Sequence, residues 1–161
     1  ALAAWRFPDG GADAVFERWT RTRAREYGLT DEGQIGHATR QTLMLLQRFR
    51  RHSLFETMDR ARRLHELPYT MAEGDRLALG QVDVLYQWEG RWHVVDFKTD
   101  RVHDRRILKQ ILAEKEYEAQ VQRYARAVAE LLGEIPVCSL CLLDYEGDVY
   151  EHPVAVEDMG S

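Results

Sequence analysis

Two aspartates and a lysine in one short segment could act together as a metal-binding and catalytic group. Asp83 ends the sequence Gly-Gln-Val-Asp, and Asp96 and Lys98 belong to the sequence Asp-Phe-Lys-Thr-Asp that starts at Asp96. Residues i and i+2 of a strand project from the same face, so Lys98 is expected beside Asp96. Carboxylate oxygens are the ligands that hard divalent cations prefer. The segment therefore predicts a cation site with an ammonium group next to it.

The residues between the two acids predict a β-hairpin that places them opposite each other. Two runs rich in β-branched and aromatic residues flank Glu89-Gly90, a pair typical of a two-residue turn. With that turn, Trp88 pairs with Arg91 and Asp83 pairs with Asp96. Directly opposed Cβ atoms lie roughly 4.5–5.5 Å apart. Two negative charges that close repel by about 3 kcal/mol at an effective dielectric constant near 20, and a bound divalent cation would offset this repulsion.

An exposed hairpin with two solvated acids would fit the same residues. The spacing of Asp96 and Lys98 is common by chance, and a one-residue bulge would change the register. Two observations favour a buried site. Apolar residues, among them Val82, Val94 and Val95, surround both acids, and directly paired residues in sheets usually carry opposite rather than like charges.

The charge distribution is uneven along the chain of 161 residues, whose length suits one domain with a substantial core. The net charge is −5, but residues 1–65 carry 12 basic against 8 acidic residues, and residues 66–161 carry 10 against 19. The basic residues of the first part are arginines, which suit phosphate contacts, although each could also belong to a solvated helix face.

The sequence also bears on location and redox state. It contains no apolar run long enough for a membrane span and no signal peptide, so we expect a cytoplasmic protein without membrane contact. It begins at Ala1 without methionine, which suggests a piece of a longer protein.

Cys138 and Cys141 are three residues apart in an apolar run. In a strand they would face opposite sides, so we expect reduced core cysteines rather than a disulfide or a shared metal.

The periodicity of the chain predicts helices followed by strands, a long helix and more strands. This order is typical of an α/β fold with a mixed sheet and helices on both faces. Pro68 places the first strand at an edge, and Gly133 is suited to a helix C-cap. The expected helices are 12–27, 30–49, 54–64 and 107–132, and the expected strands are 65–71, the two arms of the hairpin, 137–145 and 149–154.

The sequence resembles a known family of nuclease domains. Five motifs occur in order and in suitable elements, and together they resemble the nuclease domains of RecB and AddA, which belong to the PD-(D/E)xK, restriction-endonuclease-like superfamily. They are Gly33-x-x-x-His37, Glu66-Leu-Pro-Tyr69, Gly80-Gln-Val-Asp83, Asp96-Phe-Lys98 and Tyr117-Glu-Ala-Gln-Val-Gln-Arg-Tyr124. The resemblance implies a restriction-endonuclease-like core over residues 30–154, an arginine-rich helical part over residues 1–29, and a single nuclease domain over 1–161.

The resemblance also implies a role for each motif residue. Asp83, Asp96, the imidazole of His37 and the backbone carbonyl of Phe97 would hold Mg²⁺, for which Mn²⁺ could substitute. Lys98 would orient or deprotonate the attacking water and neutralise the phosphate. Gln120 and Tyr124 would contact the DNA backbone, and Glu66 would support the site by pairing with an arginine or with Lys98. For Tyr117 we expect a packing role. Two cysteines are too few for an iron–sulfur cluster.

The function expected from these residues is metal-dependent hydrolysis of DNA, by an exonuclease rather than an endonuclease. The resemblance implies the nuclease module of a bacterial, nucleoid-associated helicase–nuclease in double-strand-break repair and recombination, with a helicase domain in the same chain and a partner subunit. Two alternatives stay open. One is a stand-alone RecB-like exonuclease, and the other is a non-catalytic relative that binds DNA or a partner. The presence of both acids and the lysine disfavours the non-catalytic alternative.

Overall fold

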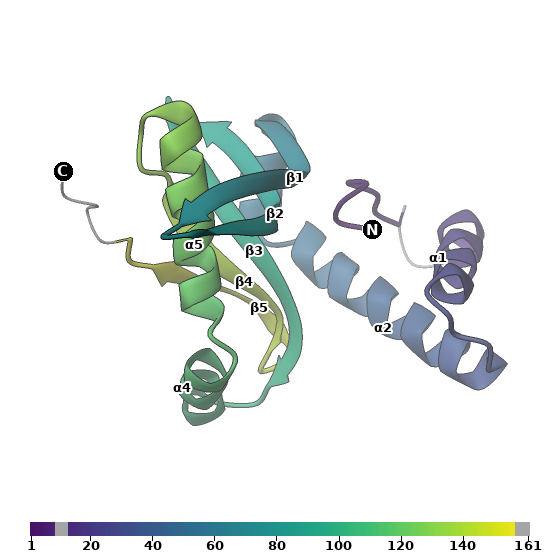
Figure 1. Cartoon of the computed structure of the whole chain (residues 1–161). Coiled ribbons are helices and arrows are strands. Elements are labelled where there is room, and N and C mark those ends of the chain that lie inside the picture. The colour runs from purple at the N-terminus through teal and green to yellow at the C-terminus, as the bar shows by residue number, and fades with distance from the viewer. Residues whose placement is uncertain (9–12, 157–161) are drawn as a thin grey trace. The chain divides into compact units, whose positions relative to one another are not determined.

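The computed structural model in Figure 1 describes residues 1–8 and 13–156 of the chain. The chain divides into two compact units, the first formed by residues 1–56 and the second beginning at Thr57. The sequence-predicted site falls across this division, because His37 belongs to the first unit and the other candidate residues belong to the second. Within the described residues, no helix is both long and apolar enough to cross a membrane.

The first unit is helical, as the sequence predicts. Helices α1 (Ala14–Glu26) and α2 (Glu32–Arg50) each begin at an aspartate, Asp13 and Asp31, whose carboxylate accepts hydrogen bonds from backbone N–H groups of the first turn. The rings of four aromatic residues pack together with centroids 4.8–6.1 Å apart, and these residues are Trp5, Phe7, Phe49 and Phe55.

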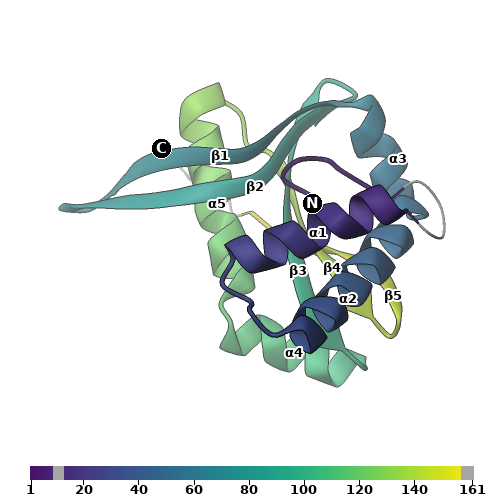
Figure 2. The same cartoon turned by 90° about the vertical axis from the view of Figure 1, so that its right-hand side faces the viewer.

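The second unit is built on a five-stranded mixed sheet (Figures 1 and 2). The strands follow one another across the sheet in chain order, and all neighbouring pairs are antiparallel except β3 and β4, which are parallel. The α/β class and the mixed sheet are therefore confirmed. The strands are β1 (Arg62–Glu73), β2 (Arg76–Trp88), β3 (Arg91–Val102), β4 (Val137–Tyr145) and β5 (Asp148–Val154).

The β2–β3 hairpin has the predicted turn. Glu89 and Gly90 have positive φ angles of 48° and 78°, as a two-residue turn of the primed type requires, and Trp88 pairs with Arg91. The ladder ends at the pair of Val84 and Val95. The expected pairing of Asp83 with Asp96 is thus wrong in detail, because the two acids lie one position beyond the last pair.

Two predicted helix boundaries are wrong. Helix α3 (Ser53–Arg60) ends earlier than predicted, because Leu64 belongs to β1 and pairs with Leu85. The long helix predicted from 107 to 132 is instead two helices, α4 (Arg105–Glu114) and α5 (Tyr117–Leu132). The break is at Glu116, whose φ of 51° is left-handed and incompatible with a continuous α-helix.

Helix α5 covers one face of the sheet, and α4 lies beyond its N-terminal end (Figure 1). The buried side of α5 packs on apolar residues of β2, β3 and β4, and this core includes Val121, Val128, Val94 and Leu140. Cys138 belongs to the same core, and Cys141 is fully buried elsewhere in β4. Both thiols are free, as predicted.

A glycine lets an aromatic side chain lie across the β1–β2 ribbon. Gly80 pairs with Tyr69, and a Cβ atom at position 80 would come within 2.4 Å of the Tyr69 ring. That ring packs edge-to-face against Tyr124 of α5, with centroids 5.8 Å apart. The absence of a side chain at Gly80 therefore permits the contact between β1 and α5.

We expect Gly80→Ala to destabilise the protein by about 1 kcal/mol, because the Tyr69 ring must leave its contact with Tyr124. Alanine normally stabilises a strand relative to glycine, so the sign of the effect identifies the clash. Urea denaturation of Gly80→Ala, Tyr69→Ala and the double variant measures the coupling. In the Tyr69→Ala background the Gly80 substitution should be neutral or stabilising, and an equal loss in both backgrounds would contradict the clash.

Candidate active site

The candidate site lies where regular pairing of β2 with its neighbours is interrupted. The β2–β3 ladder ends just before Asp83, and the β1–β2 ladder pairs His65 with Val84 and Leu67 with Val82 but omits Glu66 and Asp83 between them. Glu66 has a left-handed φ of 49°, which is incompatible with regular strand geometry. Asp83 is therefore flanked by an irregularity on each side.

The Asp83 carboxylate takes over part of the missing ladder. Its Oδ2 accepts a hydrogen bond of 3.0 Å from the backbone N–H of Phe97, the residue after Asp96. This bond ties β2 to β3 beyond the last backbone pair and fixes one Asp83 oxygen. A carboxylate has two oxygens with room for further contacts, so Asp83 can also bind a cation.

Asp96 is a buried acid whose charge is poorly compensated. Only 1% of the surface of Asp96 is exposed to solvent. Burial raises the pKa of the Asp96 carboxyl to about 6, the Lys98 ammonium lowers it in part, and the charge of Asp83 adds to the increase. Oδ2 lies 2.7 Å from Nζ of Lys98, an ion pair by distance without the alignment of a hydrogen bond. The site therefore favours additional positive charge near Asp96.

Lys98 is held on three sides. Besides its ion pair with Asp96, its Nζ donates a hydrogen bond of 2.9 Å to Oε1 of Gln120 and lies 4.2 Å from the ring centroid of Tyr117. Only 13% of the Lys98 side chain is exposed. The ammonium is thus fixed next to the acid, as the alternation along the strand predicts.

Helix α5 supplies the second polar layer of the site. The amide of Gln120 connects Lys98 to Tyr124, because its Nε2 donates a hydrogen bond of 2.5 Å to the Tyr124 hydroxyl. Burial raises the pKa of Tyr124 to about 12, with further increases from the charges of Asp96 and Asp83. Tyr124 therefore remains a protonated hydrogen-bond donor at neutral pH. Gln120 thus has two side-chain partners on this face of α5.

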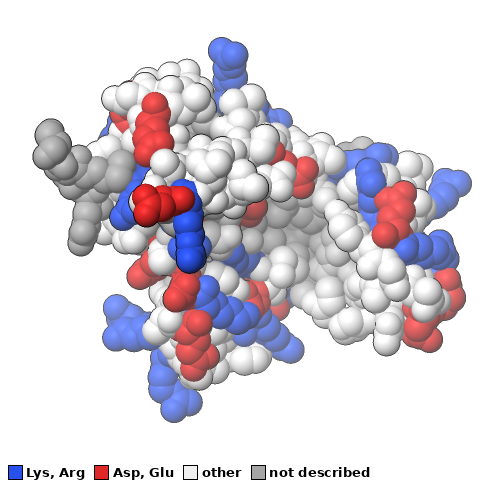
Figure 3. Space-filling view, in the orientation of Figure 1, with Lys and Arg blue, Asp and Glu red and all other residues white. Residues whose placement is uncertain are grey.

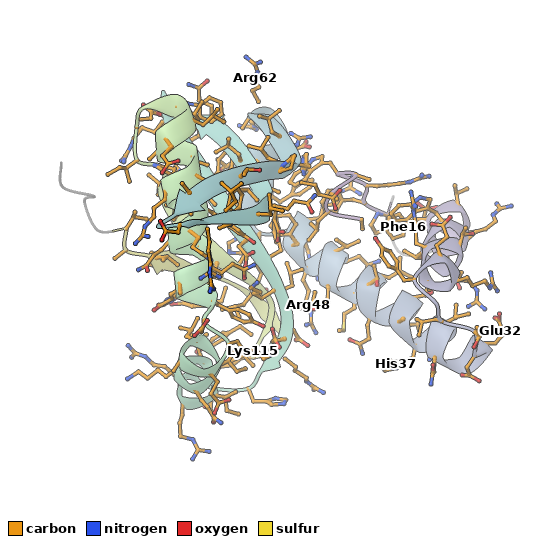
Figure 4. All side chains as sticks on the ribbon, in the orientation of Figure 1. Phe16, Glu32, His37, Arg48, Arg62 and Lys115 are labelled. Atoms are coloured by element: carbon orange, nitrogen blue, oxygen red, sulfur yellow. The ribbon has the colours of Figure 1, made fainter. Side chains whose placement is uncertain are left out.

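Three further residues predicted for the site are Phe97, Glu66 and His37. Phe97 follows Asp96 on β3. Glu66 is exposed, and its backbone carbonyl accepts a hydrogen bond from the Gln81 side chain. His37 is exposed on α2, in the first unit (Figure 4). Among the described residues, no three His, Cys, Asp or Glu side chains are gathered in a way that would bind one metal ion. Within the second unit, the acidic site consists of Asp83 and Asp96.

Sequence reasoning missed a group next to Lys98. Asp100 forms an ion pair with Lys115, which ends α4 (Figure 4), and accepts a hydrogen bond of 2.6 Å from the hydroxyl of Tyr117. The signal available in the sequence was the alternation of Asp96, Lys98 and Asp100. The break between α4 and α5, which presents Lys115 and Tyr117 to β3, had no such signal.

The arginine-rich first unit is partly neutralised by its own acids. Arg21 and Arg25 both form ion pairs with Glu32, at 2.6 and 2.7 Å, and Arg23 forms one with Glu26. Figure 3 shows acidic and basic side chains intermixed on the face of the second unit that carries α4 and α5. Exposed pairs of this kind are weak and screened by salt, so the arginines remain able to exchange partners.

We expect the buried charge of Asp96 to destabilise the metal-free protein above pH 6. The native pKa of about 6 lies above the ordinary value of 3.8 for an aspartate. The native state therefore binds a proton at a higher pH than the unfolded state does. As a result, the free energy of unfolding increases by up to about 3 kcal/mol as the pH falls from about 7 to 4. Asp96→Asn should lack this gain.

Urea denaturation with a chelator present tests this between pH 4 and 8. The variant Asp96→Asn should be more stable than the native chain near pH 8, and the difference should vanish near pH 4. Asp75→Asn serves as the matched control, because Asp75 lies at the exposed turn between β1 and β2. A pH-independent difference between Asp96→Asn and the native chain would show that Asp96 titrates normally.

Comparisons with known proteins agree with this picture at the level of fold and local sequence. No protein-family model matches the chain. One subunit of the ATP-dependent helicase/nuclease from Bacillus licheniformis is 32% identical over 75 residues, which cover 44% of this chain and 6% of that protein. The chain thus matches only a small part of this much longer relative.

One solved structure shares the fold. A protein from Eubacterium rectale, provisionally assigned as an exonuclease, superposes with a TM-score of 0.56 at 16% identity, over 95% of this chain and 62% of that one. The structure of SSO0001 gives a lower TM-score of 0.47. Its alignment with this chain has 16% identity and covers 87% of this chain and 63% of SSO0001. Through its motifs, its local match to part of a helicase/nuclease and its α/β fold, the chain resembles the RecB/AddA-type nuclease domains of the PD-(D/E)xK superfamily.

Proposed function

We propose that this chain is a metal-dependent DNA nuclease domain that hydrolyses phosphodiester bonds. Its catalytic site would be formed by Asp83, Asp96 and Lys98. The observation that carries the proposal is the buried Asp96 carboxylate, which has a raised pKa, a second acid nearby and an ion-paired lysine. Perturbed carboxylates with a fixed cationic partner are typical of catalytic sites. The resemblance to RecB/AddA-type nuclease domains supplies the class of reaction.

The acids fit a hard divalent cation such as Mg²⁺. Asp83 and Asp96 offer oxygens only, their charges act on each other, and Oδ2 of Asp96 lacks a regular hydrogen bond. The backbone carbonyl of Phe97 is a further oxygen in the sequence between Asp96 and Lys98. A Mg²⁺ ion held there would lower the pKa of water and offset the charge of the phosphate, and Mn²⁺ would substitute for it.

The residues around the acids have separate tasks in this proposal. The ion pair with Asp96 and the hydrogen bond to Gln120 fix the direction of the Lys98 ammonium, which would contact a phosphate oxygen and orient the attacking water. Tyr124, which remains protonated, would donate a hydrogen bond to the DNA backbone. Gln120 is hydrogen-bonded to both side chains, so it fixes the distance between the Lys98 ammonium and the Tyr124 hydroxyl.

We further propose that the chain acts as an exonuclease module of a helicase–nuclease in double-strand-break repair. The local match to part of a helicase/nuclease and the fold shared with a provisional exonuclease support this context. A helicase would deliver DNA strands to the site, and the arginines of the first unit would help to bind their phosphates. Their present pairing with acids predicts weak, strongly salt-dependent binding by the isolated chain.

Removal of either acid should abolish cleavage. We expect Asp83→Ala and Asp96→Ala to lower the cleavage rate by at least about 100-fold, because each removes a cation ligand. Lys98→Ala should lose turnover but retain Mn²⁺ binding, since an ammonium is not a ligand. The assay follows end-labelled linear DNA in Mg²⁺ or Mn²⁺, with calorimetric Mn²⁺ titration in parallel.

The matched control for these variants is Asp75→Ala, which makes the same change at an exposed turn between β1 and β2. It should cleave like the native chain. Circular DNA in the same assay separates the two modes of cleavage, because an exonuclease leaves it intact. Full activity of Asp96→Ala, or no cleavage of any DNA by the native chain with either metal, would refute the nuclease proposal.

His37 is proposed as a further metal contact, on the basis of its place in the motif Gly33-x-x-x-His37. We expect His37→Ala to weaken Mn²⁺ binding without unfolding the protein, so that activity falls more at limiting than at saturating metal. His103→Ala, a change at another exposed histidine, is the control. Identical metal titration curves for His37→Ala and the native chain would limit the site to residues of the second unit.

A further inference from the structure

The Lys98 ammonium rests against the ring of Tyr117, a contact that the proposed reaction does not by itself require. Nζ of Lys98 lies 4.2 Å from the centroid of the Tyr117 ring, well within the range of about 6 Å for a cation–π contact. Tyr117 is half-buried and also packs on the core beneath α5. Its ring therefore has a fixed position from which it can restrict the lysine.

The hydroxyl end of the same ring is anchored on β3. Tyr117 donates a hydrogen bond of 2.6 Å to Oδ2 of Asp100, and Oδ1 of Asp100 forms an ion pair with Lys115. Burial raises the pKa of the Tyr117 hydroxyl and the bond to Asp100 raises it further, so Tyr117 stays a donor. For Asp100, burial raises the pKa, but the bonds from Lys115 and Tyr117 outweigh it and hold the pKa below its usual range.

The backbone brings these residues together at the break between two helices. Lys115 caps α4, Glu116 adopts a left-handed conformation, and Tyr117 is the first residue of α5. A continuous helix would not allow Lys115 and Tyr117, two positions apart, to point to one carboxylate, because such residues lie on different faces of a helix. The break thus allows one carboxylate, that of Asp100, to bind both.

We propose that Tyr117, anchored by Asp100 and Lys115, is a positioning residue that holds the Lys98 ammonium toward Asp96 and the substrate phosphate. The inference rests on the nuclease function proposed above. The lysine is then confined by a carboxylate, an amide oxygen and an aromatic face, contributed by Asp96, Gln120 and Tyr117. A flexible lysine side chain loses entropy when it is fixed, and prior confinement reduces that loss when the substrate binds.

Two variants separate the ring from its hydroxyl. Tyr117→Leu removes the aromatic face but keeps an apolar side chain for packing, and we expect kcat to fall about 3- to 30-fold with unchanged KM and Mn²⁺ affinity. Tyr117→Phe keeps the face and loses the bond to Asp100, so kcat should stay within about threefold of the native value. Tyr150→Leu, at a tyrosine on β5 that is 36% exposed, is the matched control and should not change kcat.

A second readout does not depend on nuclease activity. Protons over the face of an aromatic ring are shifted upfield in NMR spectra, so the Lys98 Cε protons should be shifted in the native chain and in Tyr117→Phe, and should return to ordinary values in Tyr117→Leu. Unshifted Lys98 signals in the native chain would overturn the positioning role. So would equal kcat values for Tyr117→Leu and Tyr117→Phe in correctly folded protein.

The two proposals can fail separately. If Lys98→Ala cleaves DNA at the native rate, the nuclease mechanism is wrong, whereas the NMR shift still reports whether Tyr117 holds the lysine. If Lys98→Ala is inactive, Tyr117→Leu is fully active and the Lys98 signals of the native chain are unshifted, the mechanism stands and the positioning role is refuted.

Discussion

The buried charge of Asp96 is the constraint on which the rest of the site depends. A carboxylate that is 1% exposed would ordinarily protonate or be excluded from a sheet. Here Lys98 offsets part of its cost, while the charge of Asp83 increases it. A cation-binding site gains from such incomplete compensation, because the binding of a metal ion then removes an existing penalty. Lys98 is the group that keeps this acid ionisable, and Gln120 of α5 holds its ammonium in place.

The irregularity of β2 makes room for the acids, and specific contacts compensate for it. Where the ladders omit Asp83, the Asp83 side chain bonds to the backbone of Phe97. Further along the same strand, Gly80 allows the Tyr69 ring to reach Tyr124. These contacts hold together a region that regular backbone pairing does not, and they connect the β1–β2 ribbon to the helix that supplies Gln120 and Tyr124.

The sequence predicts those features that local pattern controls. Alternation and the Glu89-Gly90 turn predicted the hairpin, and alternation along the strand placed Lys98 beside Asp96. The pairing of Asp83 with Asp96 was not predicted correctly, since no residue type in the sequence marks the left-handed Glu66 or the end of the β2–β3 ladder at Val84 and Val95. The break at Glu116 was missed for the same reason, because no glycine or proline marks it. A packing role for Tyr117 was correct but incomplete, since spacing alone does not reveal a bond to Asp100.

The titration of the Asp96 carboxyl carbon by NMR, without and with Mg²⁺, tests the central claim most directly. Without metal, the account predicts an apparent pKa of about 6 for Asp96. With saturating Mg²⁺ the carboxyl should remain ionised to a clearly lower pH, because the ion stabilises the charged form. A titration near pH 4 without metal, or one that Mg²⁺ leaves unchanged, would contradict the claim that a poorly compensated buried carboxylate forms the cation site.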